Sequence, residues 1–304
     1  MAIVKQLSVI IEENAPRDGI QNETVPFSVE ERVELINALA DAGLKRIQIG
    51  SFVHEQRVPQ MAGTERVFEA IRKREAVVYT ALVLNDQGLA RAKACSMGYV
   101  AHFVSASQTH SLKNSNVSVE EALGRAGDLI ARAIACGMVV QAGVMNAFGC
   151  RYEGRVPEDR VLEIIETLVE AGANEISLAD TAGVAHPLQV ERMVRRVREV
   201  AKRPLSLHLH DTYGFGLANV YAAWKEGVTR FDACCGGLGG CPFIPHAAGN
   251  VATEDLALMM RCMGIETGID LPKLIAVTHS LERKLGRSLP AKARVAEGDV
   301  TCRR

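Results

Sequence analysis

The sequence predicts a single (β/α)8 TIM barrel with a helical C-terminal extension, and three observations favour this fold class. The chain has 304 residues, a length that suits one α/β barrel of ~250 residues or more. A helix-like stretch that ends in glycine and leads within a few residues into a short β-rich run recurs five times. Three further β-rich runs bring the expected strands to eight, the number that such a barrel needs.

Several of the expected strands are apolar on both faces, as strands covered by helices should be. In chain order the expected strands cover residues 7–13, 46–50, 77–83, 99–104, 138–144, 175–180, 205–211 and 230–236. Glycine suits the left-handed conformation that follows a helix, so a helix is expected to end at each of five glycines. These are Gly43, Gly98, Gly137, Gly172 and Gly227.

Helix start signals lie between the expected strands. The segments 28–31 and 118–121 both read Ser-Val-Glu-Glu, which is the spacing of a capping box. Pro157 and Pro187 suit the first turn of a helix. The sequence therefore alternates strands with helices, as a barrel requires.

The C-terminal part, from about residue 253 to 304, is predicted to form helices that extend the barrel. Thr253 is the expected N-cap, and Glu254 and Asp255 would lie in the first turn, where the helix dipole favours anions. No Gly/Ser-rich linker separates this part from the rest, so residues 1–304 are expected to form one domain. A doubly wound open sheet is the alternative fold, but no G-x-G-x-x-G follows the first expected strand.

The composition limits the kind of partner. A charged fraction of 23% with a net charge of -1 argues against a disordered tail protein. It also argues against a chain that coats nucleic acid or an anionic membrane, since both need an excess of positive charge. A small-molecule partner is expected.

The cysteine pattern and the N-terminal segment favour a soluble, cytoplasmic protein. The cysteines have irregular spacing with no C-x-x-C pair, so reduced thiols are expected rather than a zinc ribbon or a disulfide scaffold. The N-terminal segment lacks a signal-peptide pattern, and no stretch reaches the ~18 apolar residues of a membrane span. The eight cysteines are Cys95, Cys136, Cys150, Cys234, Cys235, Cys241, Cys262 and Cys302.

Polar residues gather where the expected strands end, which is the end of a barrel that carries chemistry. His208 and His210 stand two apart on the seventh expected strand, so both rings project into the mouth, with Asp211 beside them to orient a ring. A histidine pair alone is more often structural than ligating. Asp18 and Asn250 could add oxygen ligands, and this donor set suits Mg²⁺ or Mn²⁺ better than a structural zinc site.

Other mouth residues have both functional and structural interpretations. Arg17 offers a fork of donors to a carbonyl or enolate oxygen, or it forms a loop ion pair with Asp18. The loop 236–242 is glycine-rich and carries Cys241, either as a lid with a proton-transferring thiol or as a flexible turn. Three further residues would point into the same mouth or simply satisfy turns: Asn146, Asp180 and Thr181.

Together these residues resemble the 3-hydroxy-3-methylglutaryl-CoA lyase family of metal-dependent TIM-barrel lyases, which are related to Claisen-type synthases. The resemblance runs from about residue 8 to the end of the chain, with the motifs in the same order. The matching stretches are APRDGIQNE (15–23), SFV with VPQM (51–53, 58–61), GCRYEG (149–154), EISLADTAGV (175–184), HLHDTYGFGLAN (208–219), GLGGCP (237–242) and AAGNVATEDL (247–256).

The resemblance implies a role for each of these residues. Asp18, His208, His210 and Asn250 would be the cation ligands, and Arg17 would stabilise an enolate-like intermediate. Cys241 would be the lid thiol used in proton transfer. The substrate would lie beside a set of polar residues: Gln48, Ser51, Asn146, Asp180 and Thr181.

The resemblance also implies candidate contacts for CoA and an association with a second subunit. Lys113 and Asn114 are candidate contacts for the phosphate-rich end of CoA, although solvated loop residues are the simpler interpretation. Cys302 matches a position that pairs across a dimer in some animal relatives, but a free surface thiol is expected here. A homodimer or larger homo-oligomer is expected.

Three departures from the family pattern concern the acyl end of the substrate. Gln48 stands where the family has a Glu, and this removes a charge that would pair with Arg17. Residues 107–110 read Ser-Gln-Thr-His, with Gln108 where a Ser-Glu pair is usual, and residues 243–246 read Phe-Ile-Pro-His, ending in His246, where small polar residues are usual. The metal and enolate machinery looks complete, whereas the exact substrate is open.

The resemblance implies cleavage of a 3-hydroxyacyl thioester, with His208 as provisional base, to acetyl-CoA and acetoacetate, the chemistry of leucine degradation and ketone-body formation. One alternative is another reaction at the same site, either cleavage of a citramalyl-CoA-like thioester or an aldolase reaction on a 4-hydroxy-2-oxoacid. A second alternative is a catalytically silent barrel that serves as a binding subunit.

Overall fold

Eight parallel strands close into a barrel in chain order, with β1 hydrogen-bonded to both β2 and β8. This computed structural model describes residues 8–239 and 249–295. The strands are β1 Ile10–Glu13, β2 Arg46–Ser51, β3 Val78–Leu82, β4 Tyr99–Ser105, β5 Val139–Met145, β6 Glu175–Asp180, β7 Leu205–Leu209 and β8 Arg230–Ala233. The TIM-barrel prediction is confirmed, and the parallel order places all carboxyl ends of the strands at one mouth.

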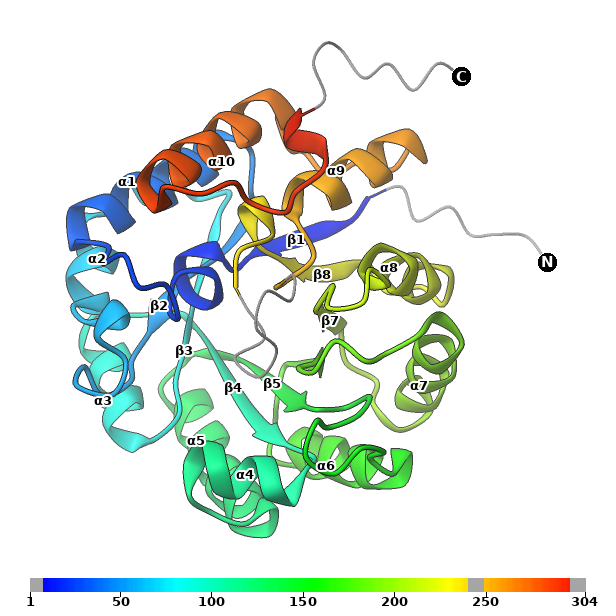
Figure 1. Ribbon diagram of the computed structural model, residues 1–304. Helices are drawn as coiled ribbons and strands as arrows, with labels where there is room; N and C mark the ends of the chain where they lie inside the picture. Colours follow the sequence, from blue (N-terminus) through cyan, green and yellow to red (C-terminus); the bar gives the residue numbers. More distant parts are fainter. Residues whose placement is uncertain (1–7, 240–248, 296–304) are drawn as a thin grey trace.

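Helices surround the barrel, as Figure 1 shows. They are α1 Val29–Asp41, α2 Thr64–Ala70, α3 Asp86–Ala94, α4 Gln108–Ser115, α5 Val119–Ala135, α6 Glu158–Glu170, α7 Pro187–Val200, α8 Gly216–Lys225, α9 Thr253–Cys262 and α10 Leu271–Leu285. α9 and α10 follow the last strand and form the predicted helical extension. Among the described residues, no helix is long and apolar enough to cross a membrane.

The barrel interior near the amino ends of the strands contains charged groups rather than hydrocarbon. Arg46 forms ion pairs with Glu12 and, at 2.9 Å, with Glu175, which in turn pairs with Arg230. Arg46, Glu12 and Glu175 are all buried. Buried charges are tolerated when they are paired, so this network fills one end of the barrel and leaves the other end as the place for chemistry.

Four of the five predicted helix-stop glycines have the expected left-handed backbone. Gly43, Gly137, Gly172 and Gly227 have φ values of 93°, 79°, 101° and 86°. The prediction for Gly98 is wrong, because the left-handed residue after α3 is Ser96, with φ 61°. A helix can end at a non-glycine residue when the chain must turn at once, so α3 stops earlier than the glycine suggests.

The start signals of the helices are largely confirmed. Ser28 forms a complete capping box with Glu31, and the Ser118 side chain accepts from the backbone of α5. The prediction that Thr253 is the N-cap of α9 is wrong, because Ala252 holds that position. The Thr253 hydroxyl instead donates to Glu13 at 2.7 Å, so a tertiary contact has replaced the local cap.

The expectation of reduced thiols holds for most of the described cysteines and fails for one. Cys262 takes part in a disulfide, and spacing along the sequence could not reveal a pairing made in space. Cys241 and Cys302 lie outside the described residues. The free cysteines are Cys95, Cys136, Cys150, Cys234 and Cys235.

Candidate metal centre and active site

A short π-helical turn, Ala15–Gly19, follows β1 and presents Arg17 and Asp18 to the mouth of the barrel. Pro16 lies in its first turn, where a missing N–H costs nothing. The carbonyl of Asn14 accepts hydrogen bonds from the backbone N–H groups of Arg17 and Gly19, at 3.0 and 3.1 Å. The backbone therefore fixes where these two side chains start.

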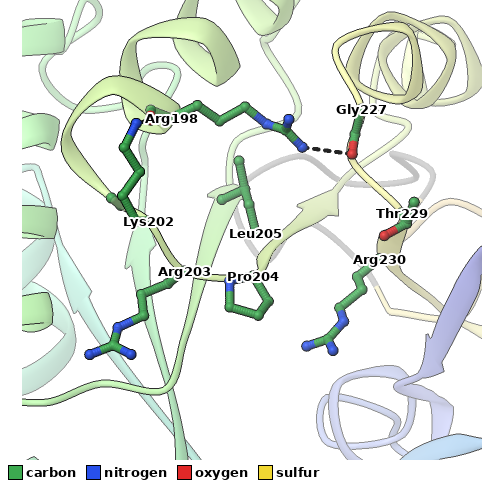
Figure 2. A pocket seen from close by; sticks show the side chains of 9 residues that line it. Arg198, Lys202, Arg203, Pro204, Leu205, Gly227, Thr229 and Arg230 are labelled. Atoms are coloured by element: carbon green, nitrogen blue, oxygen red, sulfur yellow. Dashed lines mark hydrogen bonds between the residues drawn. The ribbon is translucent and has the colours of Figure 1, made fainter. Parts of the chain in front are cut away.

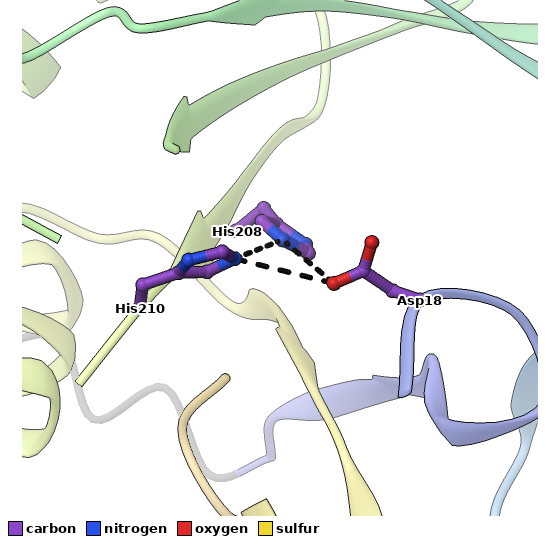
Figure 3. Close-up of side chains that lie close together, drawn as sticks. All are labelled: Asp18, His208 and His210. Atoms are coloured by element: carbon purple, nitrogen blue, oxygen red, sulfur yellow. Dashed lines mark hydrogen bonds and ion pairs between the residues drawn. The ribbon is translucent and has the colours of Figure 1, made fainter. Parts of the chain in front are cut away.

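The two histidines predicted as ligands lie at the end of β7 and face each other. Their Nε2 atoms are 3.2 Å apart, because residues two apart on an extended chain share a face. Asp18 Oδ2 lies 3.8 Å from Nε2 of His208 and 4.0 Å from Nε2 of His210. Figure 3 shows the three side chains converging, with all three candidate ligand atoms within 4.8 Å of one another.

Asn250 lies with these three residues, as predicted. Its backbone bridges to His210, and its Nδ2 donates to Asp18 Oδ2 at 2.7 Å. The Oδ1 atom of Asn250 is buried and has no hydrogen-bond partner among the described residues. A buried carbonyl oxygen without a partner is costly, so this atom fits a ligand to a cation better than a structural role.

The donor set fits a divalent cation. It combines two imidazole nitrogens, one carboxylate and the unpartnered amide oxygen of Asn250, all at the barrel mouth. Hard oxygen donors favour Mg²⁺ or Mn²⁺, while imidazole is accepted by most divalent transition metals. The residues present therefore fit one divalent ion, with room for further oxygen ligands from water or substrate.

The residue that orients His208 is Asp232 on β8, and the prediction that Asp211 orients one of the two rings is wrong. Asp232 Oδ2 lies 3.2 Å from Nδ1 of His208, and it is 3% exposed. Asp211 Oδ1 instead accepts from the backbone N–H of Gly216 at 2.7 Å, at the start of α8. The alternation of β8 turns Asp232 inward, and this was the signal available in the sequence.

Electrostatics keep these groups in states that suit a cation. Burial works against ionisation of Asp18, but Arg17 and the two histidines outweigh it and hold its pKa well below the usual range. Burial also opposes a charged His208, yet the carboxylates of Asp232 and Asp18 raise its pKa. Burial and the neighbouring His208 lower the pKa of His210 to about 4, so this ring is neutral at pH 7.

Arg17 connects the predicted ligands to Gln48. Its Nη1 pairs with Asp18 Oδ1 at 2.5 Å, and its Nε donates to the side-chain oxygen of Gln48. Gln48 is 1% exposed and comes from β2. A glutamate at this position would offset part of the Arg17 charge. The neutral amide of Gln48 does not, so more of that positive charge is available to a substrate oxygen.

The remaining predicted substrate residues are engaged with their own loops. Both oxygens of Asp180 accept backbone N–H groups at 3.0 Å, from Val184 and Ala185, while burial raises its pKa to about 6. Thr181 Oγ1 accepts from the backbone of Asn146 at 3.0 Å. These contacts organise the loops after β5 and β6.

Ser51 and the Asn146 side chain also have polar partners of their own. Ser51 is buried at the end of β2, and its hydroxyl donates to the carbonyl of Leu82 at 3.3 Å. The Nδ2 of Asn146 donates to Ser105 Oγ at 3.3 Å. Both residues lie at carboxyl ends of strands, as expected.

Of the residues predicted to meet CoA, Lys113 lies on α4 over the ring of Tyr152, 4.8 Å from its centroid. Asn114 is exposed on the same helix. Cys241 and His246 lie outside the described residues, although the start of the loop that carries Cys241 is described up to Gly239.

A separate basic hollow lies at the opposite end of the barrel, where β7 and β8 begin (Figure 2). Its volume is about 430 Å³, and Arg198, Lys202, Arg203 and Arg230 line it. It contains no histidine, cysteine or carboxylate. Because the amino ends of barrel strands support stability rather than chemistry, the candidate active site is the mouth that contains Asp18.

The fold and the site together define a (β/α)8-barrel enzyme with a candidate divalent-metal site at its mouth. A sequence model described as HMGL-like matches residues 8–281. The chain belongs to this family, whose relatives identify it as a lyase.

Three relatives illustrate the range within the family. A hydroxymethylglutaryl-CoA lyase of Bacillus subtilis is 40% identical over 93% of this chain and 95% of its own length. An (R)-citramalyl-CoA lyase of Chloroflexus aurantiacus is also 40% identical, over 93% of each chain. The structure of an HMG-CoA lyase from Acinetobacter baumannii, in complex with coenzyme A and 3-methylmalate, is 36% identical, with a TM-score of 0.91 over 97% of this chain and 96% of its own.

Proposed function

We propose that this lyase cleaves 3-hydroxy-3-methylglutaryl-CoA, or a close analogue, to acetyl-CoA and acetoacetate. The observation that carries the proposal is the cluster of Asp18, His208 and His210 beside Arg17 at the barrel mouth. The relatives named hydroxymethylglutaryl-CoA lyase support the substrate class, since they match over nearly the whole chain.

The cleavage needs a base, a positive group and an acid. A base takes the proton of the C3 hydroxyl, the new carbonyl forms, and the C2–C3 bond breaks with its electron pair passing into the thioester as an enolate. Arg17 stabilises the enolate oxygen through its guanidinium, and Cys241 gives the proton that converts the enolate carbon into the methyl group of acetyl-CoA. A divalent cation at the site would polarise the oxygens of the bound substrate and lower the pKa of its hydroxyl.

His208 carries two proposed roles, cation ligand and provisional base. A ring nitrogen that holds a cation cannot also accept a proton, and Nδ1 of His208 already faces Asp232 at 3.2 Å. The two roles are therefore alternatives: the raised pKa of His208, caused by Asp232 and Asp18 against the effect of burial, favours the base role, in which Asp18, His210 and Asn250 would hold the cation. The ligand role rests on the position of Nε2 in the cluster.

Several finer features belong to the same proposal. We propose Mg²⁺ or Mn²⁺ as the cation, CoA contacts at Lys113 and Asn114, a homodimer or larger homo-oligomer, and a cytoplasmic location. The oxygens of Asp18 and Asn250 support the choice of a hard cation. The exposed position of α4 beside the mouth-side loop of Tyr152 supports the CoA contact.

A shorter substrate of the citramalyl-CoA type is the second candidate. Gln48 favours it, because a neutral amide beside Arg17 leaves positive charge for a carboxylate held close to C3. The relative named (R)-citramalyl-CoA lyase and the related structure with 3-methylmalate support the same candidate. A 4-hydroxy-2-oxoacid aldolase would need no CoA ester at all.

The test is to assay the purified protein with Mg²⁺ or Mn²⁺ against both thioesters and against 4-hydroxy-2-oxoacids. Acetyl-CoA from the hydroxymethylglutaryl thioester supports the proposal, acetyl-CoA from the citramalyl thioester alone supports the second candidate, and product from an oxoacid alone would overturn both. Cys241→Ala should lower turnover by ~10² to 10⁴, as loss of an acid–base group does, and leave metal binding unchanged. Loss of bound metal in that variant would contradict the assigned role of Cys241. A wild-type protein that binds no stoichiometric divalent metal would favour the alternative of a catalytically silent barrel that serves as a binding subunit.

A further inference from the structure

Asn14 has a buried side chain with no hydrogen-bond partner. It is 0% exposed, and neither Oδ1 nor Nδ2 bonds to any described residue. It stands at the N-cap of the turn that carries Arg17 and Asp18, yet its side chain does not cap that turn. Asparagine usually caps when it occupies this position, so its amide is turned elsewhere.

The strand pairing indicates where this amide lies. Asn14 is two residues after Glu12, whose side chain bonds across the barrel interior to Thr80, so both face inward. Its backbone N–H continues the ladder by donating to the carbonyl of Ala233 at 2.8 Å. The last pair of β1 and β2 is Glu13 with Ile47, so Asn14, one residue beyond the end of β1, lies near the level of Gln48 on β2.

This register indicates that Asn14 lies at the floor of the mouth, near the level of Gln48, the residue that accepts from Arg17. The side-chain oxygen of Gln48 accepts from Arg17. The side-chain amides of Asn14 and Gln48 and the guanidinium of Arg17 therefore lie at about the same level of the barrel. A buried amide without partners destabilises a fold, whereas an apolar side chain of the same shape would not. An unpaired amide at the floor of an active site is explained if a ligand supplies its partner.

We propose that Asn14 binds the carboxylate arm of the acyl substrate, with Nδ2 donating to a carboxylate oxygen. This inference rests on the proposed function and adds a specificity-determining residue to it. A carboxylate fits because the side chains of Asn14 and Gln48 are neutral donors, and Arg17, whose Nη1 also pairs with Asp18, supplies positive charge beside them. A hydrocarbon arm would leave the amide unpaired and would be rejected for that reason.

The test compares two free acids that differ only in this arm. Calorimetry in the presence of Mg²⁺ gives the ratio of the affinities for 3-hydroxy-3-methylglutarate and 3-hydroxy-3-methylbutyrate, which lacks the second carboxylate. In Asn14→Leu the advantage of the diacid should fall by about tenfold to a hundredfold, the usual worth of a hydrogen bond to a charged group. The melting temperature of the ligand-free variant should stay equal or rise by a few degrees, on the order of 2–4 °C.

Asn219→Leu is the matched control. Asn219 is also 0% exposed, but its Nδ2 donates to the carbonyl of Ala185 at 3.0 Å, so its loss should lower the melting temperature and leave the affinity ratio unchanged. Asn14→Asp, which keeps the shape and repels a carboxylate, serves if the leucine variant does not fold, and it should lose the diacid advantage altogether.

An unchanged ratio in the folded Asn14 variants, or no preference for the diacid in the wild-type protein, would overturn the proposal. The thioester assay reports separately on the proposed function. A wild-type protein that prefers the diacid through Asn14 but cleaves neither thioester would disprove the lyase substrate and leave the assignment of Asn14 standing.

Discussion

At the scale of single residues, Asp232 decides how His208 meets a cation. Its carboxylate lies against Nδ1, which leaves Nε2 directed into the cluster with Asp18 and His210. Carboxylates behind metal-binding histidines fix the ring and raise its basicity. We therefore expect Asp232→Asn to weaken divalent-metal binding by ~10- to 100-fold, the usual cost of losing such a partner.

Asp211→Asn is the control for this prediction, because Asp211 is next to His210 in sequence but bonds to Gly216 instead. Titration with Mn²⁺, followed by calorimetry, measures both variants. The Asp211 variant should bind metal like the wild type and keep its stability within ~0.5 kcal/mol, because an asparagine oxygen can still accept from Gly216. Equal metal affinity in the Asp232 variant and the wild type would rule out the orienting role.

At the scale of elements, one buried carboxylate connects three segments of the site. Glu13, at the end of β1, accepts from the backbone N–H groups of Ala15 and Cys235, at 2.9 and 2.8 Å, and from the Thr253 hydroxyl. These partners begin the turn that carries Asp18, the loop that leads to Cys241, and α9. The three segments are far apart in sequence, so Glu13 fixes their relative positions.

A second buried carboxylate, Glu254 on α9, holds the same loop from the other side. It accepts from the backbone N–H of Gly236 at 2.9 Å, from the Cys235 thiol, and from the Thr278 hydroxyl on α10. No lysine, arginine or histidine among the described residues is hydrogen-bonded to it or forms an ion pair with it. Burial raises the pKa of Glu254 to about 8, and the nearby Glu13 adds to the rise.

Glu254 should make the stability of the protein depend on pH. Its folded-state pKa of about 8 lies above the unfolded value of 4.5, so the folded state binds more protons between these values. The free energy of unfolding therefore falls as pH rises from about 4.5 to 8, by up to ~1.4 kcal/mol for each pKa unit. Glu254→Gln removes this loss, so the variant should match the wild type near pH 5 and melt higher near pH 9.

Thermal melts of both proteins across this range check the prediction, with Glu69→Gln, an exposed change on α2, as the control. Glu13→Gln should act in the same direction over a window that ends lower, because burial raises the pKa of Glu13 to about 7. A Glu254→Gln protein that loses stability equally at every pH would contradict the assignment.

The sequence predicted the elements well where local signals govern and poorly where tertiary contacts do. The eight strands follow from β-rich runs, but β7 and β8 end at Leu209 and Ala233, earlier than predicted, because the chain turns to meet the segment of Asn250. Asp18, His208 and His210 were found because strand ends converge in a barrel. Asp232 was missed because its partner lies on another strand, 24 residues away in sequence.

At the scale of the whole molecule, the barrel has a charged end, where the strands begin, and a mouth, where the candidate ligands lie. Arg46, Glu12 and Glu175 neutralise one another near the amino ends of the strands. The candidate ligands lie beyond them, at the carboxyl ends, and come from segments more than two hundred residues apart, since Asn250 and Asp18 are 232 positions apart. A cation bound there would join the first and last thirds of the barrel.

This arrangement predicts that a divalent cation stabilises the whole fold. A ligand that binds only the native state adds about 2.7 kcal/mol of stability at a concentration of 100 times its Kd. For a chain of this size, that corresponds to a rise of roughly 4 °C in the melting temperature. Melts of chelator-treated protein, with and without added Mn²⁺, measure the effect. His210→Ala should abolish the rise, because the site loses one of its ligands. A rise of equal size in that variant would mean that the cation binds elsewhere, and the cluster of Asp18, His208 and His210 would then not be the metal site.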